Sequence, residues 1–304
     1  ATTSGGSTFQ ANIPTANDHV IFDSLSFNNP NQTVTLNAGP FRCKNMNWKD
    51  AQFAPNFVGN MNDTLEIFGS LTFCSAMNNN YLGKLYFYSY ANSDSISTNG
   101  ISIKGDLYFN GTGTYNVKNT LTCIKSIFLL RGTLKSNNFG ISCTNFIAAS
   151  TSIRGLNLGS SVVSISGSGN VWDAGNTGFS LTSSTSRINF TYNGILPVTI
   201  NPGGNAITYN VVQFTPKNIT FLNSGNYDTL SFQAGSLIVL EAQKNQSLNV
   251  LLANGNCGNP IEIKSSGSVP ATITNSGPSA ITCNYLRLSL ITKAGTNNMI
   301  ANNS

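Results

Sequence analysis

The chain has 304 residues, of which 40% are hydrophobic and only 9% are charged. This charged share lies far below the roughly 25% of an ordinary soluble domain, and the abundant Asn, Ser, Thr and Gly favour short strands with tight turns over long helices. The net charge of +5 is spread thinly, without a Lys/Arg cluster and without an apolar run of about 20 residues. We therefore expect neither nucleic-acid binding nor membrane insertion.

Short segments with alternating apolar and polar residues follow one another along the chain, as strands with one buried face require. Turn signals such as Asn99-Gly100 and Asn110-Gly111 separate them. The aromatic-rich start is predicted to form a cap within residues 1–60, because an open solenoid end exposes unpaired strand edges. The predicted strands include His19–Phe22, Thr33–Leu36, Thr64–Phe73, Lys84–Tyr88, Val162–Ser166, Ser186–Tyr192, Asn218–Leu222, Thr229–Phe232, Ser236–Leu240, Pro260–Lys264 and Tyr285–Leu290.

Three apolar positions recur at intervals of twenty residues in the middle of the chain. A fixed period near twenty with strand alternation indicates a repeat in which stacked units share one core. We therefore predict an all-β fold, a parallel β-helix or β-solenoid with rungs of about twenty residues, as a single domain over 1–304. A β-sandwich is the rival, but it has no reason to keep three columns in register. The columns are Ile101/Leu121/Ile141, Ile103/Cys123/Cys143 and Leu107/Ile127/Ile147.

The six cysteines are widely spaced and form no CxxC pair, so the sequence predicts no metal site of that kind. Cys123 and Cys143 share one column of the period and are predicted to be reduced core thiols, because parallel side chains in a stacked column would strain a disulfide. Cys257 and Cys283 flank the last predicted strands and are the candidate disulfide.

The chain contains a series of short sequence segments whose order resembles that in large secreted surface proteins of Bacteroidota, including gliding-motility-type adhesins exported by the type IX secretion system. The resemblance runs over nearly the whole chain and rests on the order of these segments. They are Pro14-Thr15-Ala16-Asn17-Asp18-His19-Val20-Ile21-Phe22-Asp23, Cys43-Lys44-Asn45-Met46-Asn47-Trp48, Leu65-Glu66-Ile67-Phe68-Gly69-Ser70-Leu71-Thr72-Phe73, Arg154-Gly155-Leu156-Asn157-Leu158-Gly159-Ser160-Ser161, Tyr209-Asn210-Val211-Val212-Gln213-Phe214 and Ile261-Glu262-Ile263-Lys264-Ser265-Ser266.

This resemblance implies a cell-surface or secreted location and a β-rich module that is a fragment or processed part of a larger protein. It supplies no catalytic motif and no cofactor. It also implies O-glycosylation at Asp, hydroxyl residue, aliphatic triplets, and the candidate acceptors are Ser24, Thr64, Ser95 and Thr229. The expected partners are other domains of the same polypeptide, surface glycans or neighbouring surface proteins.

Catalysis would require paired carboxylates or a calcium site with a basic residue, as in polysaccharide-active β-helix enzymes. The acids here are scattered, and the closest charged grouping is Arg42, Lys44, Lys49 and Asp50 beside Trp48. His19 is the only histidine, with no nucleophile motif to serve. We therefore assign no catalytic, cofactor or metal residue.

Tyr86, Tyr88 and Tyr90 occupy alternate positions and are candidates for stacking on sugar rings. The same alternation equally describes an inward-facing aromatic column. From the sequence we predict an extracellular structural or adhesive module without catalytic activity. The alternatives are a polysaccharide lyase or hydrolase on a β-helix and a carbohydrate-binding module.

Overall fold

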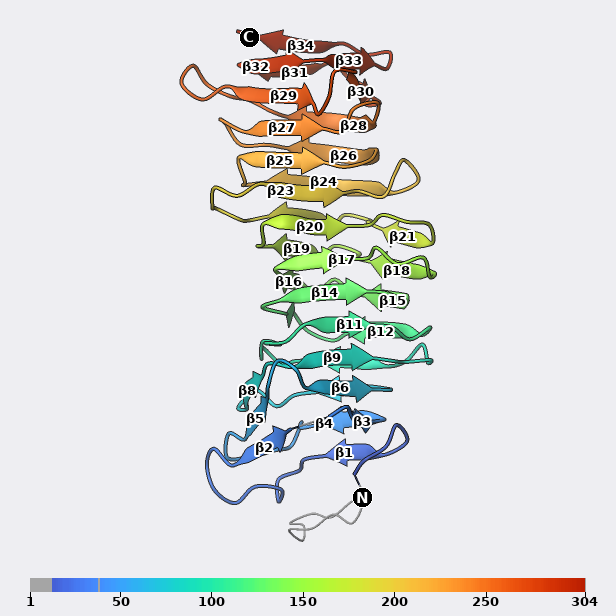
Figure 1. The fold of residues 1–304 in the computed structure, drawn as a ribbon, viewed down its shortest axis with the longest axis vertical. Coiled ribbons are helices and arrows are strands. Elements are labelled where there is room, and N and C mark those ends of the chain that lie inside the picture. The colour runs from blue at the N-terminus through green and yellow to red at the C-terminus, as the bar shows by residue number, and fades with distance from the viewer. Residues whose placement is uncertain (1–12, 38, 304) are drawn as a thin grey trace. The chain divides into compact units, whose positions relative to one another are not determined.

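The computed structural model describes residues 13–37 and 39–303. Within these residues the chain is all-β and forms no helix, and its parallel strands stack as a β-solenoid of about 13 turns (Figure 1). The predicted fold class is therefore confirmed. The predicted cap within 1–60 begins outside the described residues, and its described part already contributes the paired strands β1 to β5.

Contacts along the chain define two compact units. The first runs to Cys143 and also includes Ser152–Asn157. The second consists of Thr144–Thr151 and the residues from Leu158 onward.

The first unit is built from parallel strands that pair with their equivalents on the neighbouring turns. One sheet contains β1 (His19–Ile21), β4 (Asn45–Asn47), β7 (Leu71–Thr72), β10 (Ser95–Ser97), β12 (Thr114–Val117), β15 (Gly132–Lys135) and β18 (Arg154–Asn157). A second contains β3 (Phe41–Cys43), β6 (Thr64–Ile67), β9 (Lys84–Phe87), β11 (Leu107–Phe109) and β14 (Ser126–Leu129). The remaining strands are β2 (Thr33–Leu36), β5 (Asn56–Gly59) and β8 (Asn78–Tyr81), then β13 (Leu121–Thr122) and β16 (Ile141–Cys143).

The second unit repeats this plan with longer strands. One sheet contains β17 (Asn145–Ile147), β20 (Gly169–Asp173), β23 (Val198–Asn201), β25 (Asn218–Phe221), β27 (Leu237–Leu240), β29 (Ile261–Ser265) and β32 (Leu286–Ser289). Another contains β19 (Val162–Ile165), β22 (Arg187–Phe190), β24 (Thr208–Phe214), β26 (Gly225–Ser231), β28 (Asn245–Leu252), β30 (Ala271–Asn275) and β33 (Ile291–Ala294). The others are β21 (Phe179–Thr182), β31 (Ile281–Asn284) and β34 (Met299–Asn302).

The twenty-residue columns are in register in the first unit. Leu121 pairs with Ile141, Ile103 with Cys123, and Leu107 with Ile127. Elsewhere the turns differ in length, which explains why the period is looser outside this region. Asn45 lies 26 residues after its neighbour His19, whereas Asn119 lies only 20 after Asn99.

The prediction that Ile147 is the third member of one inward column is wrong. In β17 the buried side chain is Phe146, whereas Ile147 is half-buried on the opposite side. Only Thr144 and Asn145 separate the buried Cys143 from Phe146, one residue fewer than separate Cys123 from Ile127. Because strand side chains alternate between faces, this shorter link reverses the facing of the strand that follows.

The inward side chains form columns in which each residue packs on its equivalent one turn away. Phe87 stacks on Phe109 at 5.6 Å, and Phe190 stacks on Phe214 at 4.6 Å. Each fully buried aliphatic or phenyl side chain stabilises the fold by about 1.5–3 kcal/mol relative to exposure, before conformational entropy is subtracted. The core is therefore continuous along each unit rather than centred on one point.

Where two turns approach closely, glycine is required. A Cβ on Gly105 would overlap the carbonyl oxygen of Gly83 on the neighbouring turn. Because that obstacle is main chain, it cannot move aside without disturbing the pairing of the turns.

We predict that Gly105→Ala lowers the free energy of unfolding by about 1–3 kcal/mol, the usual cost of overpacking a rigid site. Equilibrium urea unfolding measures the change. Gly258→Ala is the matched control, because only Asn256 lies near its Cβ position, at 3.8 Å. Equal stability of the two variants would contradict the close approach of these turns.

Candidate functional site

The most distinctive surface feature is a row of aromatic side chains on the outward face of the sheet that contains β6, β9, β11 and β14. In β9 the side chains of Leu85 and Phe87 are buried in the core, so Tyr86 lies on the outward face. The register places Tyr86 beside Tyr108 and Tyr108 beside Phe128. Figure 1 shows the strands β9, β11 and β14 stacked one above the other.

These rings stack face to face from one turn to the next. The centroids of Tyr86 and Tyr108 are 4.3 Å apart with planes 9° from parallel, and those of Tyr108 and Phe128 are 4.5 Å apart with planes at 5°. Tyr88 adds parallel contacts to Tyr86 at 5.8 Å and to Phe68 at 5.3 Å. We call Phe68, Tyr86, Tyr88, Tyr108 and Phe128 the outer ladder.

The stacking decides what the outer ladder presents to a ligand. A sugar ring packs against the face of an aromatic ring, whereas the faces in the interior of this ladder already contact one another. The edges of these rings remain available for other contacts. All five side chains are half-buried, which agrees with rings that stand on edge in the sheet.

The three tyrosines predicted to bind glycans do not form one platform. Tyr86 and Tyr88 belong to the outer ladder, while Tyr90 lies beyond the end of β9, is 68% exposed and has no ring contact among the described residues. Tyr90 therefore offers the freest ring face of the three.

The charged grouping near the start of the chain does not converge on one point. Arg42 pairs with Glu66 at 2.6 Å in the column that continues into Tyr86, and the Lys44 amine donates to the carbonyl of Phe68 at 3.0 Å. Lys49 and Asp50 lie in an exposed turn. Trp48 is fully buried, and its ring stacks on that of Phe22 at 3.8 Å.

Farther along the chain, Glu262 and Lys264 occupy half-buried positions on the outward face of β29.

His19 contacts a side chain of the neighbouring turn. The side-chain amide of Asn45, its neighbour in the register, lies 2.9 Å from His19 Nδ1 and donates to it when the ring proton is on Nε2. The preceding Asp18 carboxylate accepts hydrogen bonds from the Thr15 hydroxyl and amide. These bonds lower the pKa of Asp18. Both donors belong to Thr15, so the carboxylate is hydrogen-bonded within its own turn.

All six cysteines are free thiols, so the structure does not join the predicted pair Cys257 and Cys283. Cys257 is exposed in the turn after β28, whereas Cys283 is buried in β31. Cys123 and Cys143 are buried, reduced thiols, as predicted. Burial raises the pKa of Cys123 to about 12 and raises that of Cys143 well above its ordinary value.

The four predicted O-glycosylation triplets differ in their exposure. Ser24 lies in an exposed turn, and Leu25 after it is 67% exposed. Thr64, Ser95 and Thr229 are half-buried strand residues. Each of these three is followed by an aliphatic side chain buried in the core, namely Leu65, Ile96 and Leu230. Only the triplet at Ser24 presents all of its side chains at the surface of the folded chain.

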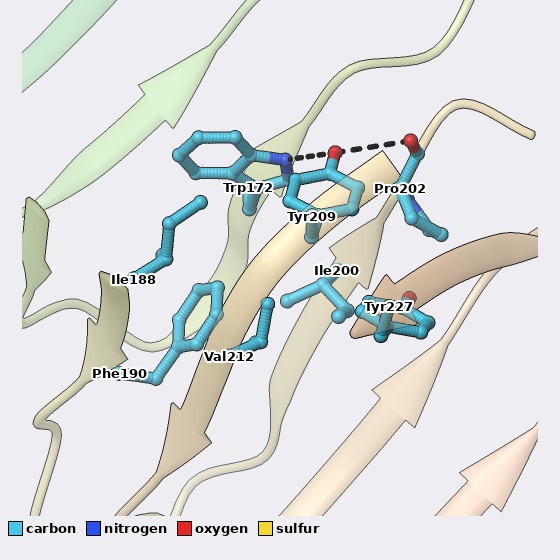
Figure 2. A pocket seen from close by; sticks show the side chains of 8 residues that line it. All are labelled: Trp172, Ile188, Phe190, Ile200, Pro202, Tyr209, Val212 and Tyr227. Atoms are coloured by element: carbon cyan, nitrogen blue, oxygen red, sulfur yellow. Dashed lines mark hydrogen bonds between the residues drawn. The ribbon is translucent and has the colours of Figure 1, made fainter. Parts of the chain in front are cut away.

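The second unit encloses a small cavity between inward columns, with Trp172, Tyr209 and Tyr227 in its wall (Figure 2). Trp172 Nε1 donates to the Tyr209 hydroxyl, which donates to the carbonyl of Pro202, both at 3.0 Å. The cavity measures about 10 Å³, room for one water molecule, whereas ligand pockets measure roughly 300–1,000 Å³. It is therefore a packing defect of the core rather than a binding site.

The described residues contain no helix that is both long enough and apolar enough to cross a bilayer. Comparison of the chain with protein-family models, with curated proteins and with solved structures found no match.

We predict that one thiol per chain reacts with a maleimide in the native protein and all six after unfolding, because five are buried and Cys257 is exposed. Mass spectrometry of the labelled protein, followed by peptide mapping, measures this. Cys257→Ser removes the native reaction and serves as the control. Rapid native labelling of Cys123 or Cys143 would contradict the core described above.

We also predict a loss of stability at alkaline pH that depends on the outer ladder. Desolvation, with the nearby Asp106 and Tyr86, raises the pKa of Tyr108 to about 12, above the value of about 10 in an unfolded chain. The folded state therefore holds this proton more tightly, so its stabilising contribution is complete below about pH 10 and is lost as pH rises towards about 12.

Urea unfolding at about pH 9 and about pH 11 measures this loss. Tyr108→Phe should reduce the difference between the two conditions, although buried tyrosines such as Tyr115, whose pKa is also raised, keep part of it. Tyr90→Phe is the control, because it leaves every ring contact of the ladder in place. An unchanged difference in Tyr108→Phe would show that Tyr108 is solvated as in the unfolded chain.

Proposed function

We propose that this protein is an extracellular structural or adhesive surface module without catalytic activity. The observation that supports this best is the outer ladder, whose side chains contact one another from turn to turn. A face used in this way adds cohesion between turns. The structural or adhesive role would depend on the stiffness and the length of the stacked turns.

Main-chain pairing and polar side chains add to this cohesion. The Asn119 side-chain oxygen accepts from the amides of Thr98 at 3.0 Å and Asn99 at 3.2 Å, one turn earlier. Its amide group donates to the Asn99 side chain at 2.9 Å. Asn80 likewise donates to Asn56 at 2.7 Å. Such bonds hold turn regions, as at Asn99 and Asn119, and paired strands, as at Asn56 in β5 and Asn80 in β8, in the register of the neighbouring turns.

The positions of the charged residues support a role without catalysis. Acid–base chemistry on a polysaccharide needs two groups that face one substrate atom. Arg42 is instead paired with Glu66, and Lys44 is bonded to a carbonyl of the main chain.

The proposed location and partners rest on the resemblance to secreted Bacteroidota surface proteins. The partners would be other domains of the same polypeptide, surface glycans or neighbouring surface proteins. O-glycosylation, if it follows folding, would be restricted to Ser24, because the other three triplets bury their aliphatic residue.

Glycan binding is the second candidate function, and the exposed ring of Tyr90 with the outward tyrosine edges favours it. The two functions assign different roles to the same side chains. In a cohesive ladder the ring of Tyr108 matters and its hydroxyl does not. In a glycan-binding surface both the hydroxyl of Tyr108 and the exposed ring of Tyr90 matter.

We predict that Tyr108→Ala lowers the free energy of unfolding by about 1–3 kcal/mol, because it removes two stacked contacts of a half-buried ring. Tyr90→Ala, the matched control, should change it by less than about 0.5 kcal/mol. Urea unfolding measures both. The structural role is contradicted if Tyr108→Ala is as stable as the unaltered protein.

The same variants separate the two candidate functions on a glycan array. If the protein is a structural module, neither Tyr108→Phe nor Tyr90→Ala changes its binding to any glycan on the array. Binding that either variant weakens, with stability retained, would favour a carbohydrate-binding module. Incubation with acidic and neutral polysaccharides tests for the enzyme, and product release that disappears in Lys49→Ala/Asp50→Ala would overturn the proposal.

A further inference from the structure

The chain contains four Asn-Gly pairs, and their hydrogen bonds differ in a way that bears on their chemistry. The pairs are Asn99-Gly100, Asn110-Gly111, Asn193-Gly194 and Asn254-Gly255. Such a pair carries its own nucleophile and electrophile, because the main-chain nitrogen of the glycine can reach the side-chain carbonyl carbon of the asparagine. Glycine lacks the side chain that would hinder this approach. Whether the two groups can meet therefore depends on the contacts that hold each pair.

In two of the pairs the asparagine side chain is bonded to neighbouring turns. The Asn99 amide group donates to the carbonyl of Phe73 at 2.7 Å, and its oxygen accepts from the Asn119 side chain at 2.9 Å. The Asn254 side-chain oxygen accepts from the main-chain amide of Asn284 at 2.9 Å. The glycine amide that follows Asn254 donates to the carbonyl of the same Asn284 at 2.8 Å. Neither pair can rearrange without breaking these bonds.

In the pair at Asn110 the glycine itself is enclosed. Gly111 is buried, and its amide donates to the Tyr115 hydroxyl at 2.7 Å. That hydroxyl donates in turn to the carbonyl of Phe87 at 2.8 Å. The Gly111 nitrogen must lose its proton before it can attack, and a buried amide that donates a hydrogen bond holds that proton tightly. The fold therefore blocks this pair at its nucleophile.

Asn193-Gly194 differs from the other pairs in each of these respects. The pair belongs to the surface segment 191–197, between β22 and β23, and both of its residues are exposed. Within the part of the chain that the structure describes, neither the Asn193 side chain nor the Gly194 amide forms a hydrogen bond. The main-chain hydrogen bonds of this segment lie at its ends, at Thr191 and Pro197. The reacting groups of this pair are therefore free to approach each other.

We propose that Asn193 is a site of spontaneous modification, at which the folded protein converts asparagine to isoaspartate and aspartate. The deprotonated nitrogen of Gly194 attacks Cγ of Asn193. The new C–N bond closes a five-membered succinimide, and the side-chain nitrogen leaves as ammonia with the proton that Gly194 gave up. Water then opens the ring at one of its two carbonyls, which yields isoaspartate or aspartate. Either product adds a negative charge to the segment.

The position of this pair makes the modification compatible with the fold. Isoaspartate adds a carbon atom to the main chain, which shifts the residues that follow and breaks pairing that depends on register. At Asn99 or Asn254 this shift would act on side chains that bond neighbouring turns. At Asn193 it acts outside the strands, so the pairing of the turns is retained. The proposal is independent of the function proposed above.

The test is incubation of the purified chain in a mildly alkaline buffer made with heavy-oxygen water, with circular dichroism to follow the folded state. Ring opening in this solvent labels every residue that reacts before digestion. Mass spectrometry of the peptides then measures each pair separately. We expect Asn193 to react at least about tenfold faster than Asn99, Asn110 and Asn254, which corresponds to about 1.4 kcal/mol in the barrier.

Two controls separate the effect of the fold from that of the local sequence. In guanidinium chloride the hydrogen bonds are lost, so all of the Asn-Gly pairs should react at similar rates. Asn193→Gln should remove the modification at this position, because glutamine would have to close a less favourable six-membered ring, and should leave the other pairs unchanged. The proposal is overturned if another pair reacts as fast as Asn193 in the folded chain. It is also overturned if Asn193 reacts only after unfolding, or if its excess rate persists in guanidinium chloride.

Discussion

Parallel main-chain pairing in register between successive turns is the constraint on which the rest of this structure depends. It places each side chain beside its equivalent one turn away, at the spacing of neighbouring strands, about 4.8 Å. Inward positions then become stacked columns such as Phe87 on Phe109, and outward positions become ladders such as Tyr86 on Tyr108. The same constraint demands glycine where main chains nearly touch, as at Gly83 and Gly105.

Stacking also changes what a surface aromatic residue can do. Isolated on a flat sheet, Tyr108 would offer a ring face to a sugar. Between Tyr86 and Phe128 at 4.3 and 4.5 Å, its faces are occupied and its burial raises the pKa of its hydroxyl. The outer ladder is therefore better suited to stabilising the fold than to recognising a ligand.

The strand alternation and the middle columns at Ile103, Leu107 and Leu121 can be predicted from the residues alone, because both patterns are local and repeat at a constant interval. The sequence could not determine which outward residues meet, since the offset between paired residues on neighbouring turns varies from 18 to 29 and one residue reverses the facing of a strand. The folded arrangement of the turns is what places Phe146 rather than Ile147 in the core and stacks Tyr86 on Tyr108 while Tyr90 stays apart. It also leaves Cys257 exposed and buries Cys283. Each of these depends on the length of the connecting turns, which the alternation within a strand does not encode.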